Sequence, residues 1–231
     1  MPIASPQPLS NENGTTLVEL MVALMAGLVI ISALTMVILT TMHGSARVTA
    51  RVEATQRTRL ALTRLMQELH SACVSPEIAP VKAASTGSTI QFVHQTGSAV
   101  SPIPVWSEVS LSGTSLVQQD YGVTGTAPSW GRGAAIGGPR TLLTDVGPIP
   151  PSSSIFSYYR YENGTIASSA QKTPLEVNEA ALTVEVKASL RVEPERTPVH
   201  DTGAAADVTN AATLRLTPPS FNEGSPSRPC S

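Results

Sequence analysis

Apolar residues gather in one long run near the N-terminus of this chain. The stretch "LMVALMAGLVIISALTMVIL", from Leu20 to Leu39, contains no charged residue and no proline. A helix rises about 1.5 Å per residue, so this stretch is long enough to cross a hydrocarbon core of about 30 Å. We therefore predict a membrane-spanning helix over residues 15–42.

Helical periodicity continues after the apolar run ends near His43. Apolar residues recur at spacings of three and four with polar residues largely between them, as in an amphipathic helix. These apolar positions are Val48, Val52, Leu62, Leu65, Met66 and Leu69. A proline disfavours helix in the residue before it, so the helix should end before Ser75-Pro76. We expect one helix of about 55 residues, whose amphipathic half over residues 43–73 packs on the rest of the chain.

From Val74 onward the period of the pattern falls to about two, which is typical of β-strands. Asn163-Gly164 is a strong hairpin-turn signal, and Ser112-Gly113 predicts a second hairpin. The expected strands are Ser88–Gln95, two within Val105–Tyr121, Arg140–Val146, two around Asn163-Gly164, one in residues 180–194 and one in residues 210–218. Residues 122–140 and the tail from residue 217 are expected to be irregular. The fold class is thus α+β, with a β-rich head over residues 74–231.

Charge and composition exclude some classes of partner. The 231 residues carry a net charge of −2, so nothing predicts a nucleic-acid partner, which needs a clustered basic face. Basic residues do follow the apolar run, but Glu53 and Glu68 are interleaved with them. We interpret them as a solvated helix face: Arg47, Arg51, Arg57, Arg59 and Arg64.

Residues that carry enzyme chemistry do not form a recognisable motif. There is no nucleophile elbow, phosphate loop, dinucleotide fingerprint or zinc-protease motif, and the four histidines are scattered. Ser169-x-x-Lys172 matches a catalytic pattern, but chance explains it in a serine-rich loop. Phe156, Tyr158, Tyr159 and Tyr161 crowd one expected strand, where packing is the favoured role. We expect no enzyme activity, no metal and no cofactor.

The two cysteines, Cys73 and Cys230, belong to no metal-binding spacing. If the region after the apolar run lies in an oxidising compartment, they can form a disulfide. Two free thiols are the alternative.

The N-terminus combines a polar leader, residues 1–14, with a carboxylate, Glu19, at the edge of the apolar run. The leader lacks the basic start of a secretory signal peptide. The stretch "GTTLVELMVAL" resembles the prepilin-type segment of type IV pilins and type II secretion pseudopilins. This resemblance implies that prepilin peptidase cleaves between Gly14 and Thr15 and that the new N-terminus is methylated. It also implies that Glu19, fifth in the mature chain, serves filament assembly.

The resemblance gives a reason for Glu19. A carboxylate within hydrocarbon costs about 2.5–3.5 kcal/mol unless it is paired. Cleavage creates an α-amino group near Glu19, and that ammonium on one subunit can pair with Glu19 of a neighbour. Short phrases such as "RLALTRLMQELHSA" and "IFSYYRYENG" are similar to J-type minor pseudopilins, which favours a minor subunit.

The partners implied by the resemblance are prepilin peptidase, other subunits bound through the N-terminal helix, an inner-membrane assembly platform and the lipid bilayer. The precursor would be a single-pass inner-membrane protein with an extracytoplasmic head. Charge alone predicts the reverse topology, since the leader has no Lys or Arg while Arg47 and Arg51 follow the helix. The alternatives are a major pilin and a membrane-anchored adhesin or ligand-binding β domain that never polymerises.

Overall fold

The computed structural model describes residues 16–74, 78–98, 101–194, 205–214 and 230. The chain forms two units, Met1–Ala46 and Arg47–Ser231. Helix α1, Leu17–His70, contributes to both and contains 54 residues. Its length and its end before Ser75 confirm the long helix expected from the sequence. Among the described residues it is the one helix long and apolar enough to cross a membrane.

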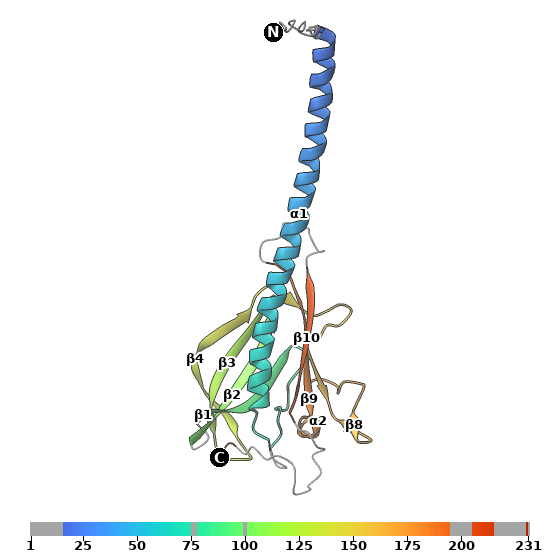
Figure 1. Ribbon diagram of the computed structural model, residues 1–231. Helices are drawn as coiled ribbons and strands as arrows, with labels where there is room; N and C mark the ends of the chain where they lie inside the picture. The colour runs from blue at the N-terminus through green and yellow to red at the C-terminus, as the bar shows by residue number, and fades with distance from the viewer. Residues whose placement is uncertain (1–15, 75–77, 99–100, 195–204, 215–229, 231) are drawn as a thin grey trace, which may run out of the picture. The chain divides into compact units, whose positions relative to one another are not determined.

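In the second unit, four antiparallel strands form the first sheet in the order β1-β2-β3-β4 (Figure 1). The strands are β1, Thr89–Ser98; β2, Ser101–Ser112; β3, Ser115–Thr124; and β4, Gly131–Leu143. The predicted hairpin between β2 and β3 is present, with Ser112 paired to Ser115 and Gly113 at φ 61°. After α1, the backbone amide of Cys73 donates to Val93 at 2.8 Å, which joins the helix end to β1.

The expectation of an irregular segment over residues 122–140 is correct only for residues 125–130 and wrong on either side of them. Strand β3 continues to Thr124 and β4 begins at Gly131. Glycine allows the two strands to approach here, because a Cβ on Gly133 would lie 2.8 Å from the carbonyl oxygen of Gly122. Such a strand is held by backbone pairing and by few alternating side chains, so periodicity alone does not reveal it.

The second sheet has the order β10-β9-β5, and β6 also pairs with β9. Its strands are β5, Val146–Gly147; β6, Phe156–Tyr159; β9, Glu185–Val192; and β10, Ala206–Thr213. A separate hairpin joins β7, Tyr161–Glu162, to β8, Thr165–Ile166. Its turn places Asn163 at φ 52° and Gly164 at φ 82°, as a type I′ turn requires.

Two elements of the second sheet differ from expectation. The short helix α2, Val177–Leu182, was not expected, and it precedes β9 where a strand was predicted to begin. The last strand, β10, begins four residues earlier than predicted and ends at Thr213. The final part of the predicted strand, from residue 215, lies outside the described residues.

The core of the second unit joins both sheets to one face of α1. Leu62, Leu65 and Leu69 are at most 1% exposed and lie in the same cluster as Phe92 and Leu190. Figure 1 shows this part of α1 beside both sheets, and burying such a leucine contributes about 1.5–3 kcal/mol. The buried stripe begins at Ala54. Val48 and Val52, expected on this stripe, are 64% and 49% exposed.

Candidate functional site

The first turn of α1 contains the carboxylate that the sequence singled out. The backbone amide of Glu19 donates to Oγ1 of Thr16 at 3.3 Å, so Thr16 caps the helix. Glu19 is therefore close to the positive end of the helix dipole, which stabilises a carboxylate. Gly14 and Thr15, the predicted processing residues, lie outside the described residues.

The apolar half of α1 is exposed on every side. From Leu17 to Met42 the large apolar side chains are between 51% and 75% exposed. The hydroxyls of Ser32, Thr35 and Thr41 each donate at 2.8 Å to the carbonyl oxygen four residues earlier. Polar groups in hydrocarbon need such internal acceptors, so the segment is suited to lipid or to apolar helix partners.

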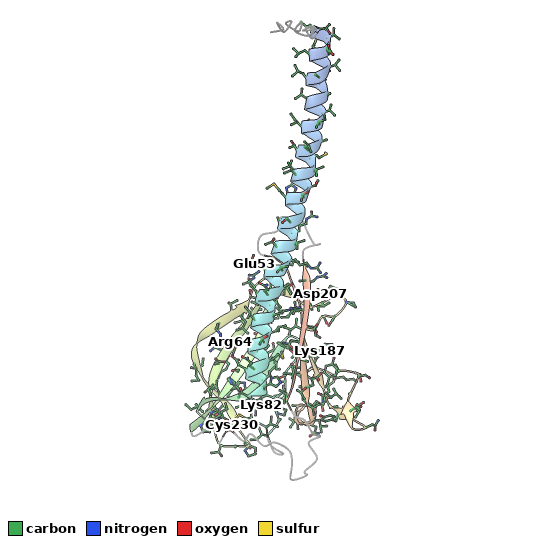
Figure 2. The ribbon with its side chains drawn as sticks, viewed as in Figure 1. Glu53, Arg64, Lys82, Lys187, Asp207 and Cys230 are labelled. Atoms are coloured by element: carbon green, nitrogen blue, oxygen red, sulfur yellow. A yellow bond between two sulfur atoms is a disulfide. The ribbon has the colours of Figure 1, made fainter. Side chains whose placement is uncertain are left out.

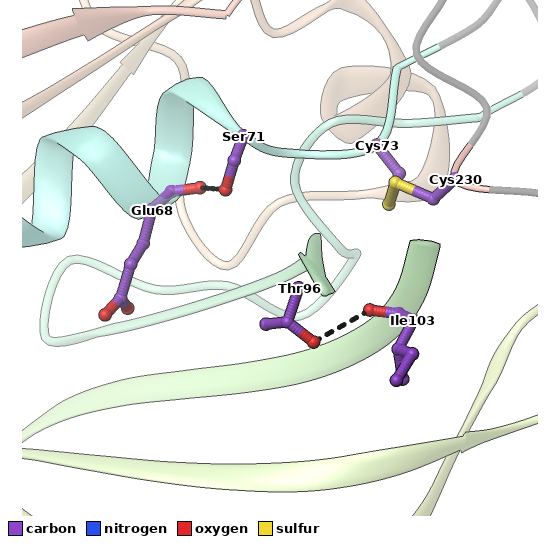
Figure 3. Close-up of a disulfide and its surroundings, with 6 residues drawn as sticks. All are labelled: Glu68, Ser71, Cys73, Thr96, Ile103 and Cys230. Atoms are coloured by element: carbon purple, nitrogen blue, oxygen red, sulfur yellow. Dashed lines mark hydrogen bonds between the residues drawn. A yellow bond between two sulfur atoms is a disulfide. The ribbon is translucent and has the colours of Figure 1, made fainter. Parts of the chain in front are cut away.

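A disulfide joins Cys73, just after α1, to Cys230 (Figure 3). The Cα atoms are 5.6 Å apart and the pair is separated by 157 residues in sequence. Both cysteines are buried against Ile78, Val93 and Trp130. Figure 2 also labels Cys230 in the head. Of the two states that the sequence left open, the structure contains the bonded one.

Lys82 lies beside the apolar cluster around this disulfide. Its Nζ is 5.3 Å from the ring centroid of Trp106 and 5.7 Å from that of Trp130, within cation–π range. Burial lowers the pKa of Lys82 below its ordinary value. The two aromatic faces partly replace the water that the ammonium has lost.

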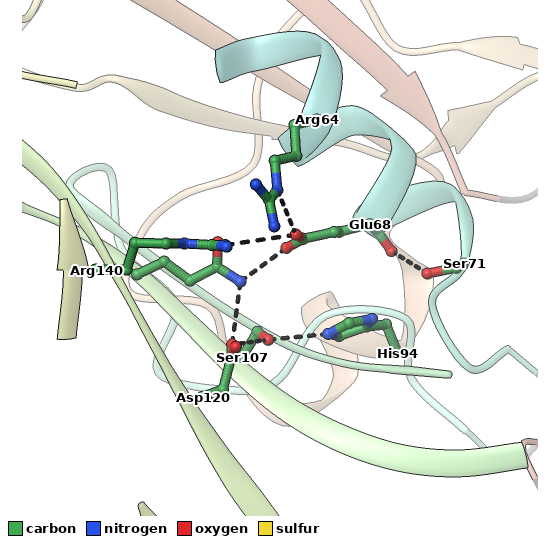
Figure 4. Close-up of polar contacts among 8 residues, drawn as sticks. Arg64, Glu68, Ser71, His94, Ser107, Asp120 and Arg140 are labelled. Carbon is green, nitrogen blue, oxygen red and sulfur yellow. Dashed lines mark hydrogen bonds and ion pairs between the residues drawn. The ribbon is translucent and has the colours of Figure 1, made fainter. Parts of the chain in front are cut away.

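A polar network connects the end of α1 to the first sheet (Figure 4). Its centre is Glu68, whose carboxylate accepts a 2.8 Å hydrogen bond from Nε2 of Gln118. Arg64 and Arg140 approach the same carboxylate at 3.4 and 3.7 Å. Gln118 also donates to Asp120 at 3.0 Å and accepts from Arg140 at 2.8 Å.

The network ends at a buried histidine. Oγ of Ser107 donates to Oδ1 of Asp120 at 2.6 Å, and Nε2 of His94 lies 3.0 Å from Oγ of Ser107. Because Ser107 gives its one proton to the carboxylate, Nε2 of His94 is the donor of the other bond. Burial lowers the pKa of His94, while Glu68, Asp120 and the backbone of Gln95 oppose the shift.

The hydroxyl of Ser107 is directed at Asp120 and not at His94. Ser107 is fully buried and hydrogen-bonded directly to a carboxylate, so His94 is not placed to take its proton. What the network does is hold the end of α1 against β1, β2, β3 and β4.

The aromatic residues that the sequence singled out lie in or beside the packed core. Phe156 and Tyr158 are buried, as packing predicted, while Tyr159 and Tyr161 are half-buried. Burial raises the pKa of Tyr158, whose hydroxyl donates to the carbonyl of Thr86 at 2.9 Å. In the part of the chain that the structure describes, no three His, Cys, Asp or Glu side chains gather as a metal site would require.

Two features of the site were missed by sequence reasoning. The Thr16-x-x-Glu19 spacing is a capping-box signature and was sufficient to place the start of α1. The Glu68 network was harder to find, although Gln118 and Asp120 share one face of a strand. No model of a known protein family matches this chain, and no curated protein matches it.

Proposed function

We propose that this chain is a structural subunit of a type IV pilus or of a pilus-like secretion or DNA-uptake filament. It is made as an inner-membrane precursor, cleaved after Gly14 and assembled through its N-terminal helix. A minor subunit is favoured by the sequence resemblance alone. The observation that carries the proposal is Glu19 in the first turn of a helix whose apolar surface is exposed on every side.

The start of α1 is compatible with cleavage at this position. The cap residue, Thr16, follows the proposed new N-terminus, Thr15, so the cut would leave the cap hydrogen bond to Glu19 intact. The new ammonium of one subunit would then lie near the carboxylate of its neighbour. Only one axial offset between neighbouring helices satisfies that pair, which sets the register of the filament.

The disulfide supports an extracytoplasmic head. Disulfides persist in oxidising compartments and are rare in the cytosol. The bond between Cys73 and Cys230 therefore favours the topology implied by the resemblance over the topology implied by Arg47 and Arg51. Protease shielding of the head in spheroplasts would instead place it in the cytoplasm.

Mass spectrometry of the membrane form tests the cleavage. We expect a chain beginning at Thr15, and Gly14→Val should leave the leader attached. Gly44→Ala is the matched control, because a Cβ at Gly44 meets nothing within 4 Å. A wild-type chain that keeps Met1 or Pro2 would favour a membrane-anchored module that does not polymerise.

Sheared filaments test the role of the carboxylate. Glu19→Ala should be cleaved normally yet be depleted from the filament fraction. Glu53→Ala removes an exposed carboxylate from the same helix and should be incorporated like the wild type. Equal incorporation of Glu19→Ala and Glu53→Ala would contradict the assembly role.

A further inference from the structure

The hairpin of β7 and β8 forms a sheet of its own, separate from the two larger sheets of the head. Each strand has two residues, and Figure 1 shows β8 at the margin of the head, beyond β9 and β10. Besides the strand pairing, the amide of Ala167 donates to the carbonyl of Arg160 at 2.8 Å, and Oγ1 of Thr165 donates to that of Glu162 at 3.2 Å. A two-stranded hairpin is marginally stable in water, so we expect this one to open locally without unfolding the head.

The tip of this hairpin is Asn163 followed by Gly164, and both residues are exposed. Within the described residues, neither the side chain of Asn163 nor the amide of Gly164 forms a hydrogen bond. Glycine has no Cβ, so nothing on residue 164 obstructs its amide nitrogen when that nitrogen approaches a neighbouring group. In the closed type I′ turn the backbone of Asn163 directs this nitrogen away from the Asn163 side chain. The two groups therefore meet only when the hairpin opens.

The other two asparagines in the described parts of the chain lie in different surroundings. Asn178 is within helix α2 and is followed by Glu179. Asn210 is in β10, and its Oδ1 accepts a 2.9 Å hydrogen bond from the amide of the next residue, Ala211. Neither is followed by a glycine in a turn, so both serve as internal comparisons for Asn163.

We propose that Asn163 is a site of spontaneous deamidation, with the backbone nitrogen of Gly164 as the nucleophile. When the hairpin opens, this nitrogen loses its proton to a base in the solvent and attacks Cγ of Asn163. The new C–N bond closes a five-membered imide, the bond from Cγ to Nδ2 breaks, and ammonia leaves with the proton that the base returns. Water then adds to one of the two imide carbonyls and breaks the bond from that carbonyl to nitrogen. The product is aspartate or isoaspartate, formed without any oxidant or reductant.

The two products change the hairpin in different ways. Aspartate preserves the main chain and still suits the turn, because Asp-Gly favours a type I′ turn as Asn-Gly does. Isoaspartate carries the main chain through the side-chain carbon, and the longer turn no longer keeps Glu162 opposite Thr165. Either product adds one negative charge to a chain whose net charge is −2, beside the ion pair of Arg160 and Glu162. The oldest copies of the protein therefore carry the most acidic hairpin, whether or not they assemble into a filament.

Peptide mass spectrometry of the full-length chain tests this site. The chain is incubated in micelles with its disulfide intact, at neutral and at mildly alkaline pH, and is then digested with trypsin. Cleavage after Arg160 and Lys172 isolates residues 161–172, which separates Asn163 from the other Asn-Gly pair, Asn13-Gly14.

The peptide of residues 161–172 should gain the mass difference between a hydroxyl and an amino group. The gain should be on the order of tenfold faster than in the peptides that contain Asn178 and Asn210, because only Asn163 precedes an unobstructed glycine nitrogen. Alkaline pH should accelerate it, since the attacking nitrogen must lose its proton. Isoaspartate methyltransferase, used as a labelling reagent, should modify the same peptide.

Two pairs of variants make the test specific. Asn163→Gln should abolish the gain, because glutamine would have to close a larger ring. Thr165→Val removes the hydroxyl that donates to Glu162 and should accelerate the gain about two- to fivefold, because the hairpin opens more often. Thr209→Val is its matched control, since it removes an exposed hydroxyl bonded to Ser189 in the second sheet and should leave the rate unchanged.

Three results would overturn the proposal. In the first, residues 161–172 gain mass no faster than the peptides that contain Asn178 and Asn210. In the second, the gain persists in Asn163→Gln, which would place it at Gln171, the other amide side chain of the same peptide. In the third, Thr165→Val and Thr209→Val have the same effect on the rate, which would show that opening of the hairpin does not control the reaction.

Discussion

The carboxylate of Glu68 accepts a 2.8 Å hydrogen bond from Gln118, 50 residues later in the chain. Glu68 is on α1 and Gln118 is on β3, so this bond joins the helix end to the first sheet. The side chain of Glu68 is 18% exposed, and two arginines also approach it. A charged group so enclosed stabilises the head only while its partners remain in place.

Glu68→Ala should lower the free energy of unfolding of the full-length chain in micelles by about 1–3 kcal/mol, because it leaves one of the two N–H groups of the Gln118 amide without its acceptor. Urea denaturation measures this change. Glu53→Ala, on an exposed part of the same helix, should change stability by less than about 0.5 kcal/mol. If the two substitutions changed the free energy of unfolding equally, the Glu68 network would not be a source of stability.

The buried His94 should make the head sensitive to acid. Its folded pKa lies below the unfolded value of 6.5, so the unfolded chain binds this proton first as the pH falls. The stability that His94 contributes is full above about pH 6.5 and declines below it until the folded pKa is reached. The difference in unfolding free energy between wild type and His94→Gln, measured from pH 8 to pH 5, should fall below pH 6.5. A difference independent of pH would contradict this assignment.

Removing the disulfide should destabilise the head substantially. The double substitution Cys73→Ser and Cys230→Ser frees a loop closed over 157 residues, and loss of such a bond costs about 2–5 kcal/mol. Thermal unfolding of the oxidised wild type, the reduced wild type and the double variant measures the effect. The reduced wild type should resemble the variant. Two titratable thiols in the chain isolated from membranes would contradict the bond itself.

The loss of unfolding free energy on shortening an apolar side chain of α1 should depend strongly on how deeply that side chain is buried. Leu65→Ala removes a side chain that is 1% exposed and should cost about 2–5 kcal/mol. Val48→Ala removes a side chain that is 64% exposed and should cost much less. The midpoints of urea unfolding distinguish the two, and similar costs would mean that the buried stripe extends to Val48.

The sequence predicted those elements whose side chains follow a strict period. Helix α1 and the β2–β3 hairpin were found because apolar spacing and turn residues point to the same structure there. The first part of strand β4, residues 131–139, was missed because Gly131, Gly133 and Gly137 give no alternation of side chains, whereas its end lies within the predicted strand Arg140–Val146. Helix α2 was missed because its six residues run directly into the alternating pattern of β9.

The parts of the candidate site that stand out in the local sequence could be predicted, and the parts that depend on packing could not. Glu19 and the cysteines stand out locally, as one carboxylate beside an apolar run and as two thiols without metal spacing. The partnership of Glu68 with Gln118 and Arg140 depends on how α1 packs against the first sheet. No local pattern contains that information, because the partners come from three separate elements.

The bond between Cys73 and Cys230 makes the intervening chain a covalent ring. A protease that cuts one peptide bond within this ring opens it but releases no fragment, since both ends remain attached through sulfur. After one such cut, the head therefore remains covalently attached to α1. Only a reducing agent, or a second cut within the ring, would separate the parts.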